Sequence, residues 1–472
     1  MQYIDKDLSS IQETRNLLEN AQQAFLMLNQ YSADELDKIS SAVMRELSLN
    51  ISRFATELTD ESAVGCPEAE TQLCTQFLKA FKEKIQGQKY VGLLEGSVQA
   101  REMSVGMPLG VLGVILPETT TLALLANIVL ITIKSGNTVV FLPNEKSKES
   151  VFRIIDEMSK MAADAHLPTG AIACVSTVTS LAVQEMMNNP YTALILDVGR
   201  PEYAHGNDKN SKPFIYGGVG SSPVFIEHSA DLEKAAQDVV ESRAFNHGIL
   251  PAAEQFLVVE NSVVEEVKTF MKKYGAYFMN HEEEKRLLAF IKASKDWKVN
   301  NYVGKTALWL AEKAQINVPA GTLVLVSLQD YMCEDSVYNE ELACPLIAFY
   351  QEPDWLHACE KCLNILREEK MGHTLTIHSR NEQVIREFVL KKPVGRVIVN
   401  APTVFAATGL VSNLPPSMLL GGISTGRGQS AGNITPKDLT YVKNAGFASE
   451  DSGSNDSHAS QDTLNKVLEL FV

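Results

Sequence analysis

The sequence predicts an α/β protein with two parallel-sheet domains behind a helical N-terminal segment. Three observations support this fold class: helical periodicity near the start, apolar runs that alternate with helices after residue 110, and a second such alternation after residue 224. Continuous Val, Ile and Leu strands that alternate with helices are typical of a parallel sheet covered on both faces. We therefore expect a doubly wound, Rossmann-like first domain and a second α/β domain.

The helical N-terminal segment covers residues 8–58 and 67–88. Leu17, Ala21, Ala24 and Phe25 share one stripe at helical spacing, which predicts a buried helix face. The first alternation has strands at 111–116, 138–142, 171–175 and 193–197, with helices at 122–134, 148–165 and 180–187. The second has strands at 224–226, 256–259, 322–326, 348–350 and 396–400, with helices at 231–245 and 263–274.

Composition narrows the classes of partner. The chain has 472 residues, 45% of them hydrophobic and 21% charged, and a formal net charge of −16. Nucleic-acid binding depends on clustered Lys and Arg, so we expect no nucleic-acid partner. Residues 1–20 lack the apolar core of a signal peptide, and the apolar runs 109–116 and 122–133 are too short to cross a bilayer. We expect no membrane segment and a cytoplasmic location.

The seven cysteines do not form the framework of a secreted disulfide protein. Cys359 and Cys362 have the spacing of a metal or redox pair, but they lie in a predicted helix without a second ligand pair. We therefore expect no metal site and a reducing compartment.

The C-terminal part differs in composition from the rest of the chain. Residues 448–461 are rich in Ser, Asp and Gly, which predicts a flexible linker. In residues 462–472, the side chains of Leu464, Val467, Leu468 and Phe471 fall on one face of a helix, with Asp462 or Thr463 as N-cap. So short a helix is marginal in water by itself, so the apolar face needs a partner.

The most informative motif is Phe-Asn-His-Gly-Ile-Leu-Pro-Ala-Ala-Glu-Gln at residues 245–255. Further motifs are Gly-Val-Leu-Gly-Val-Ile-Leu-Pro at 110–117, Ser-Gly-Asn-Thr-Val-Val-Phe at 135–141, Gly-Val-Gly-Ser-Ser-Pro-Val at 218–224, Gly-His-Thr at 372–374, the run 396–402 and Asn-Ile-Thr-Pro at 433–436. Together they resemble the aldehyde dehydrogenase superfamily. Gly-Val-Gly followed by Pro-Val is similar to the CoA-acylating branch, which includes the dehydrogenase half of bifunctional aldehyde-alcohol dehydrogenases and microcompartment acylating enzymes.

The resemblance covers residues 8–446 and implies the domain limits. Residues 1–230 hold the helical segment and the Rossmann-like cofactor domain, with an oligomerisation arm near 93–107, and residues 231–425 form the catalytic-type domain. The arm is expected to pair with residues near 434–446 of a neighbouring subunit, within a return segment at 426–447. A homodimer or a dimer of dimers follows from the family.

In the family, a cysteine thiolate attacks the aldehyde, an Asn stabilises the oxyanion, hydride passes to NAD, and CoA accepts the acyl group. In this sequence the matched nucleophile position is Pro251, which has no nucleophilic atom. Thr120 stands at the Asn position, and the neighbouring Glu118 adds a negative charge where an oxyanion would develop. His247 is the remaining candidate base of the loop, although a hydrogen-bonded loop histidine is the simpler interpretation.

The cofactor positions implied by the resemblance are also altered. The phosphate-binding turn reads Val-Gly-Arg-Pro-Glu at 198–202, so only Gly199 of its glycines remains. The side chains of Arg200 and Glu202 fill the space through which the pyrophosphate would approach the backbone. Arg200 would attract a phosphate and Glu202 would repel it. Pro143 and Asn144 replace residues that lie along the adenosine ribose. Glu341 still matches the ribose-binding Glu, although by itself it is more simply a solvated or capping carboxylate.

Two further alternatives concern substitute nucleophiles. Cys344 matches a position on the ribose side, which favours a packing role over that of a displaced thiol. Ser221 and Ser222 are most simply turn residues.

The leading hypothesis is an inactive or strongly impaired CoA-acylating aldehyde dehydrogenase that acts as a non-catalytic partner or scaffold. It could serve as microcompartment cargo that binds a shell or other enzymes through residues 462–472. Alternatives for this helix are docking on its own oligomer or a frayed end. The alternative function is an active NAD-dependent enzyme with an unrecognised nucleophile.

Overall fold

The computed structural model describes residues 5–97, 102–200, 212–217, 220, 222–296, 302–332, 336–368, 373–422, 430–446 and 466–467. Three helices come first: α1 (Lys6–Leu28), α2 (Ala33–Ser62) and α3 (Pro67–Lys84). The side chain of Asp5 caps α1, a reciprocal capping box between Ser32 and Glu35 starts α2, and Pro67 occupies the first turn of α3. The predicted helical N-terminal segment is therefore confirmed.

The first sheet has the strand order β5-β4-β3-β6-β7, and all its pairs are parallel. Its strands are β3 (Val111–Ile115), β4 (Thr138–Leu142), β5 (Ile172–Cys174), β6 (Thr192–Val198) and β7 (Phe214–Gly217), and its helices are α4 (Leu122–Lys134), α5 (Lys148–Asp164) and α6 (Ser180–Asn188). One apolar core joins α1 and α6 to one face, and a second joins α2 to α5 to the other. The strand order reverses between β3 and β6, where doubly wound sheets bind ligands.

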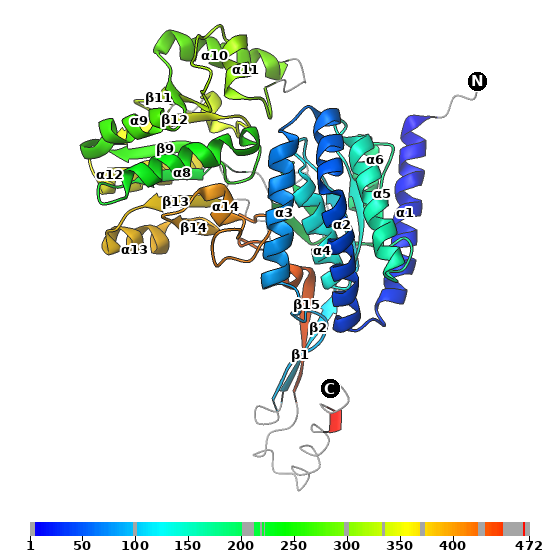
Figure 1. Ribbon diagram of the computed structural model, residues 1–472. Coiled ribbons are helices and arrows are strands. Elements are labelled where there is room, and N and C mark those ends of the chain that lie inside the picture. The colour runs from blue at the N-terminus through cyan, green and yellow to red at the C-terminus, as the bar shows by residue number, and fades with distance from the viewer. Residues whose placement is uncertain are drawn as a thin grey trace.

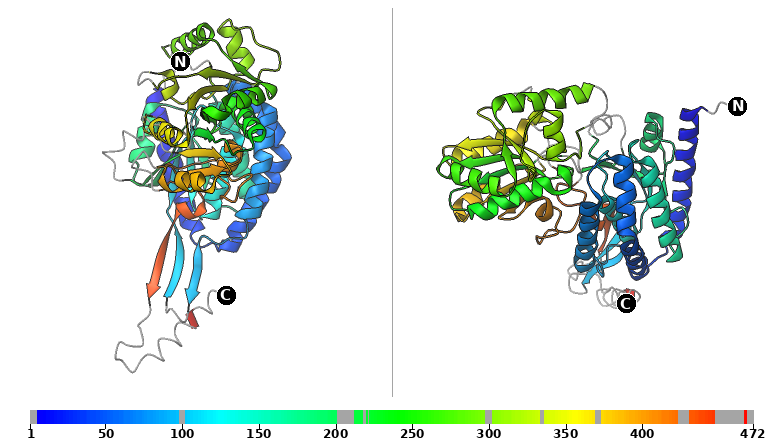
Figure 2. Two further views of the ribbon diagram at one scale, coloured as in Figure 1. Left: turned by 90° about the vertical axis from the view of Figure 1, so that its left-hand side faces the viewer. Right: turned by 45° about the horizontal axis from the view of Figure 1, so that its top comes forward.

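The second sheet has the order β10-β11-β12-β9-β8-β13-β14, again with parallel pairs. Its strands are β8 (Ser222–Ile226), β9 (Glu254–Glu260), β10 (Ala276–Phe278), β11 (Val324–Leu328), β12 (Leu346–Glu352), β13 (Thr374–His378) and β14 (Arg396–Val399). Its helices are α8 (Leu232–Ala244), α9 (Val264–Lys273), α10 (His281–Asp296), α11 (Ala307–Lys313), α12 (Trp355–Glu368), α13 (Glu382–Lys391) and α14 (Thr403–Ala407). The predicted α/β fold is confirmed, and the two sheet domains lie side by side (Figures 1 and 2).

The chain passes from the first sheet to the second between β7 and β8. The strand at 222–226 therefore pairs in the second sheet, although it precedes the expected limit at residue 230. The division into domains otherwise remains a prediction.

A third, antiparallel sheet forms an arm below the first domain (Figure 1). It contains β1 (Gly92–Ser97), β2 (Glu102–Pro108) and β15 (Thr440–Gly446). The pairing partner expected from sequence was wrong: β15 pairs with β2 of the same chain, from Thr440 opposite Pro108 to Gly446 opposite Glu102. β15 begins opposite Pro108, the last residue of β2, so its backbone groups find their hydrogen-bond partners within the chain. Most of β15 is exposed.

The predicted linker lies outside the described residues, as does most of the C-terminal helix; residues 466 and 467 are helical. Among the helices that the structure describes, none has the length and apolarity needed to cross a membrane.

Candidate functional site

The loop that contains Pro251 connects α8 to β9 and has an unusual backbone. Asn246, His247, Gly248 and Ala252 have positive φ angles of 47°, 57°, 75° and 68°. Left-handed conformations are unfavourable for residues with a Cβ atom and persist only where surrounding contacts enforce them. The loop is therefore held in a specific shape around a half-buried Pro251.

A buried carboxyl group enforces this shape. The Asn246 side chain donates from Nδ2 to Glu70 Oε1 at 2.6 Å and accepts from the Cys66 backbone N–H at 2.9 Å. The other oxygen, Glu70 Oε2, accepts from the Leu122 backbone N–H at 2.8 Å, in the first turn of α4. Glu70 thus joins the Pro251 loop to the helix that follows the Thr120 turn.

Burial raises the pKa of Glu70 to about 7, although both donors favour the ionised form. The role of Glu70 was not predicted from the sequence, because a glutamate in an amphipathic helix is ordinarily solvent-exposed. A signal was present in the sequence, since Glu70 falls among the apolar positions Ala69, Leu73 and Cys74 of the buried helix face.

Gly248 lies against the backbone of Cys344. A Cβ atom on Gly248 would lie 2.8 Å from the carbonyl carbon of Cys344, so both the positive φ and the close approach require glycine. The Cys344 thiol is fully buried, and burial raises its pKa to about 11. At neutral pH it is a protonated thiol, in keeping with the packing role expected from sequence.

The turn after β3 does not present the hydroxyl of Thr120 as a free donor. Thr120 is buried, and its Oγ1 donates to the Pro117 carbonyl at 2.7 Å. The expected repulsive charge of Glu118 is compensated by an ion pair with Lys146 Nζ at 2.6 Å. Lys146 was not predicted as part of this site; it follows β4 and reaches this turn because β3 and β4 are neighbours.

His247 is held as a structural residue of the loop. Its Nδ1 lies 2.8 Å from the Gly304 carbonyl, a contact that places the proton on Nδ1. Burial lowers its pKa, and the nearby Lys305 lowers it further. The imidazole is therefore neutral at physiological pH, in keeping with the simpler of the two interpretations.

The expected cofactor residues lie at the carboxyl ends of β4 and β6. Pro143 is buried, and Asn144 is half-buried, with its Oδ1 accepting from the Lys146 backbone N–H at 3.0 Å. Gly199 has a φ of 75°, and the Arg200 backbone N–H donates to Asp197 Oδ1 at 3.1 Å.

These residues do not fit a pyrophosphate group well. An N–H that would point to a phosphate at this turn is already bonded to the carboxylate of Asp197, which also repels anions. Glu202 and Ser221 lie outside the described residues.

Glu341, the expected ribose-binding residue, lies beside Gly220. It is half-buried, its carboxyl group accepts from the Gly220 backbone N–H, and desolvation raises its pKa to about 7. Gly220 itself leaves no room for a side chain, because a Cβ atom there would lie 2.7 Å from the Cβ of His373. Ser222 is buried at the start of β8.

The last two residues of the loop motif are structural. Glu254 Oε1 accepts from the Thr403 backbone N–H at 2.9 Å, which caps α14, and burial raises its pKa to about 7. The amide of Gln255 donates to the carbonyls of Tyr338 and Glu340 at 2.7 and 2.8 Å and accepts from the Leu342 N–H at 2.7 Å. The side chains of Glu254 and Gln255 therefore hold the end of the loop that contains Pro251.

Comparisons with known proteins agree with this architecture. A crystal structure of an acetylating aldehyde dehydrogenase from Geobacillus thermoglucosidasius has a TM-score of 0.91 and 30% identity, with 96% of this chain and all of that chain covered. A probable aldehyde dehydrogenase from Listeria monocytogenes EGD-e has the same TM-score and 32% identity, with 95% and 99% covered. The succinate-semialdehyde dehydrogenase (acetylating) of Clostridium kluyveri is 27% identical, with 93% of this chain and 96% of that protein covered.

Two further similarities are more limited. An aldehyde-alcohol dehydrogenase of Streptococcus pneumoniae is 29% identical over 76% of this chain, which spans 42% of that protein. A propionaldehyde dehydrogenase from a fucose utilisation microcompartment of Clostridium phytofermentans shares the fold, with a TM-score of 0.80 and 22% identity over 91% of this chain and 96% of that one.

The profile of the aldehyde dehydrogenase family matches residues 7–412, which include both parallel sheets and the loop at 245–255. The chain therefore belongs to the aldehyde dehydrogenase family, and its relatives include enzymes of the acetylating, CoA-dependent type.

Proposed function

We propose that this protein is a non-catalytic member of the CoA-acylating branch that acts as a partner or scaffold for other proteins. The observation that carries the proposal is Pro251, which stands in the shaped loop where the family places its cysteine. In a comparable catalytic unit, removal of the nucleophile lowers turnover by on the order of a million-fold. The occupied hydroxyl of Thr120 removes a second contribution, because it already donates to Pro117.

The decisive assay measures NADH formation from acetaldehyde or propionaldehyde with CoA and NAD. The wild-type protein is expected to show no turnover above a denatured control. Turnover that co-purifies with the protein and follows its concentration would refute the proposal.

Restoring the thiol tests whether the surrounding site is still formed. Pro251→Cys is expected to gain a covalent thioester adduct with acyl-CoA, detectable by intact-protein mass spectrometry, because Glu70, Glu254 and Gln255 still hold the loop. Pro251→Ala is the matched control, since it removes the ring without adding sulfur. An adduct on both variants or on the wild type would contradict the assignment of position 251.

For the alternative of an active enzyme, the described residues offer Cys66 as a candidate nucleophile. Cys66 is half-buried and its backbone N–H donates to Asn246 of the loop. Burial raises the pKa of Cys66, which disfavours the thiolate and places this alternative second. If wild-type turnover is found, its loss in Cys66→Ser and retention in Cys359→Ser would establish the alternative.

NAD binding without turnover would fit a cofactor-sensing role. We propose that NAD binding is weak, because the carboxylate of Asp197 occupies the Arg200 N–H at the phosphate turn. Titration calorimetry with NAD measures this directly. Binding at micromolar concentration would contradict the proposed weakening, without bearing on the missing nucleophile.

We also propose that residues 462–472 act as an address to a bacterial microcompartment. The support is the apolar face of Leu464, Val467, Leu468 and Phe471 behind a polar linker, together with the shared fold of a microcompartment enzyme. Several weakly binding copies on an oligomer would bind together by effective concentration. Deletion of 462–472 should move the protein out of co-expressed shells, whereas Asn465→Ala should not.

A further inference from the structure

A cluster of charged side chains lies at the carboxyl edge of the second sheet, away from the Pro251 loop. Glu227 directly follows β8, Glu260 ends β9, and these two strands are hydrogen-bonded neighbours. The Pro251 loop enters β9 at its opposite end, so the seven-residue strand separates the two places by roughly 20 Å at about 3.3 Å per residue. The cluster is therefore distinct from the site described above.

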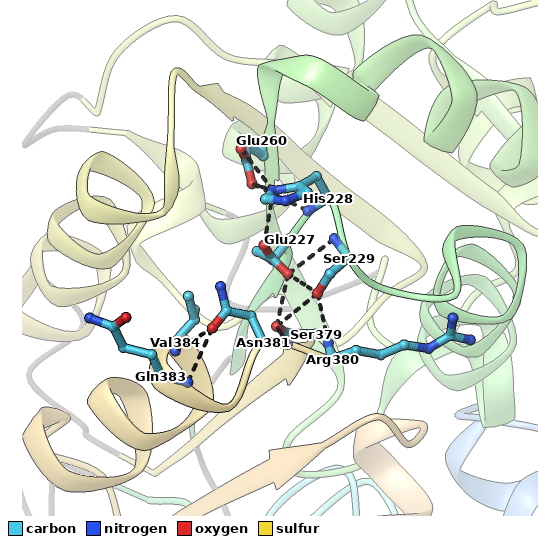
Figure 3. A network of polar contacts seen from close by, with 9 residues as sticks. All are labelled: Glu227, His228, Ser229, Glu260, Ser379, Arg380, Asn381, Gln383 and Val384. Atoms are coloured by element: carbon cyan, nitrogen blue, oxygen red, sulfur yellow. Dashed lines mark hydrogen bonds and ion pairs between the residues drawn. The ribbon is translucent and has the colours of Figure 1, made fainter.

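The side chain of His228 joins the two carboxylates (Figure 3). Its Nδ1 lies 2.9 Å from Glu227 Oε1 and 3.0 Å from Glu260 Oε2. One nitrogen and one oxygen from each glutamate all lie within 4.8 Å of one another. Three potential metal ligands thus converge from two neighbouring strand ends.

One oxygen of Glu227 is fixed by its surroundings, and this orients the other. Oε2 accepts from the Ser229 N–H at 3.1 Å, from the Ser229 hydroxyl and from Ser379 Oγ at 2.8 Å. The side chain of Glu227 is fully buried, and Oε1 faces His228 (Figure 3). Such hydrogen bonds to the second oxygen are typical of carboxylates that are oriented toward a metal.

Oε1 of Glu227 has no hydrogen-bond donor among the described residues. It lies 2.9 Å from His228 Nδ1, with which it forms an ion pair when the imidazole is protonated, and the same nitrogen is hydrogen-bonded to Glu260. A buried carboxylate oxygen without a donor is unfavourable unless a cation compensates its charge. Two carboxylates, one of them fully buried, thus share one imidazole nitrogen, and a divalent cation would balance their charges better.

We propose that Glu227, His228 and Glu260 bind one Zn²⁺ ion. An imidazole nitrogen and carboxylate oxygens are zinc ligands at bond lengths of about 2.0–2.2 Å, which place tetrahedral ligand atoms roughly 3.3 Å apart. The two nitrogen–oxygen separations, 2.9 and 3.0 Å, require shifts of a few tenths of an ångström, and the two carboxylate oxygens lie within 4.8 Å of each other. The exposed ring of His228 leaves room for water as the fourth ligand, and the ion would tie the ends of β8 and β9 together.

The test measures zinc stoichiometry and affinity in the purified, chelator-treated full chain, by competition with a chromogenic chelator and by elemental analysis after dialysis. One zinc ion per chain and a raised melting temperature are expected for the wild type. His228→Asn and Glu260→Gln are each expected to weaken binding at least tenfold. Absence of stoichiometric zinc at micromolar free ion, or unchanged affinity in both variants, would overturn the proposal.

The chain offers a matched control for the histidine. His357 is exposed to the same degree, 57% against 55% for His228, and its Nδ1 lies 2.9 Å from a single carboxylate oxygen, of Asp354. His357→Asn should leave zinc affinity unchanged. Cys359→Ser controls for the cysteine pair on α12, and loss of the zinc in this variant or in His357→Asn would refute the assignment to Glu227, His228 and Glu260.

Discussion

The buried carboxyl group of Glu70 provides a sharp test of how the Pro251 loop is held. Its pKa is about 7 in the folded protein, against 4.5 in the unfolded chain. As the pH rises above 4.5, the unfolded chain loses this proton first, so the unfolded state is favoured. The contribution of Glu70 to stability therefore falls between pH 4.5 and 7 and is constant above that range.

The size of the effect follows from the shift. A difference of this size between the folded and unfolded pKa corresponds to about 3 kcal/mol of unfolding free energy, of which about 2 kcal/mol falls between pH 5.5 and 8. Glu70→Gln cannot titrate and keeps a side chain of nearly the same shape. Its stability relative to the wild type should therefore improve by about 2 kcal/mol from pH 5.5 to 8, whatever the constant offset of the substitution.

The assay is reversible urea unfolding of both proteins at pH 5.5 and 8, compared as a difference so that other titrating groups cancel. Glu68→Gln is the control, because Glu68 is exposed on the same first turn of α3 and should give the same offset at both pH values. If the difference between Glu70→Gln and the wild type changes by less than about 0.5 kcal/mol, Glu70 does not ionise as the burial argument requires.

Two substitutions test the rest of the framework. Gln255→Leu leaves two buried backbone groups without partners and should lower the unfolding free energy by about 2–6 kcal/mol. The control Gln383→Leu, on the exposed surface of α13, should change the unfolding free energy by less than about 0.5 kcal/mol. Equal effects of the two substitutions would contradict the role of the buried amide. Gly248→Ala adds backbone strain and a clash with Cys344, whereas Gly87→Ala, at a φ of 81° with open space around it, adds about 1–2 kcal/mol of strain alone. Circular-dichroism melting curves should show a larger loss of stability for Gly248→Ala than for Gly87→Ala. A smaller loss of stability for Gly248→Ala would refute the crowding around Gly248.

The sheet fold could be predicted in detail because its signals are local. The apolar runs at 111–116 and 138–142 became β3 and β4, and every residue of α4 between them is buried, as expected for a helix that covers a parallel sheet. The motif around Pro251 predicts a lost nucleophile, and this remains a prediction. The partner of the arm was wrong, because an antiparallel strand makes the same hydrogen bonds with its own chain as with a neighbour, and only the path of the return segment decides between them.

The sequence by itself determined the alternation of strands and helices, the family and the absence of sulfur at position 251. Tertiary structure decided which distant groups meet: Glu70 bonds to groups 52 and 176 positions away, and His228 meets a carboxylate 32 positions further along the chain. The physical reason is the distance along the chain over which each interaction acts. Periodicity and turn chemistry act over a few residues, whereas burial of a charge and convergence of ligands depend on how complete sheets and helices pack.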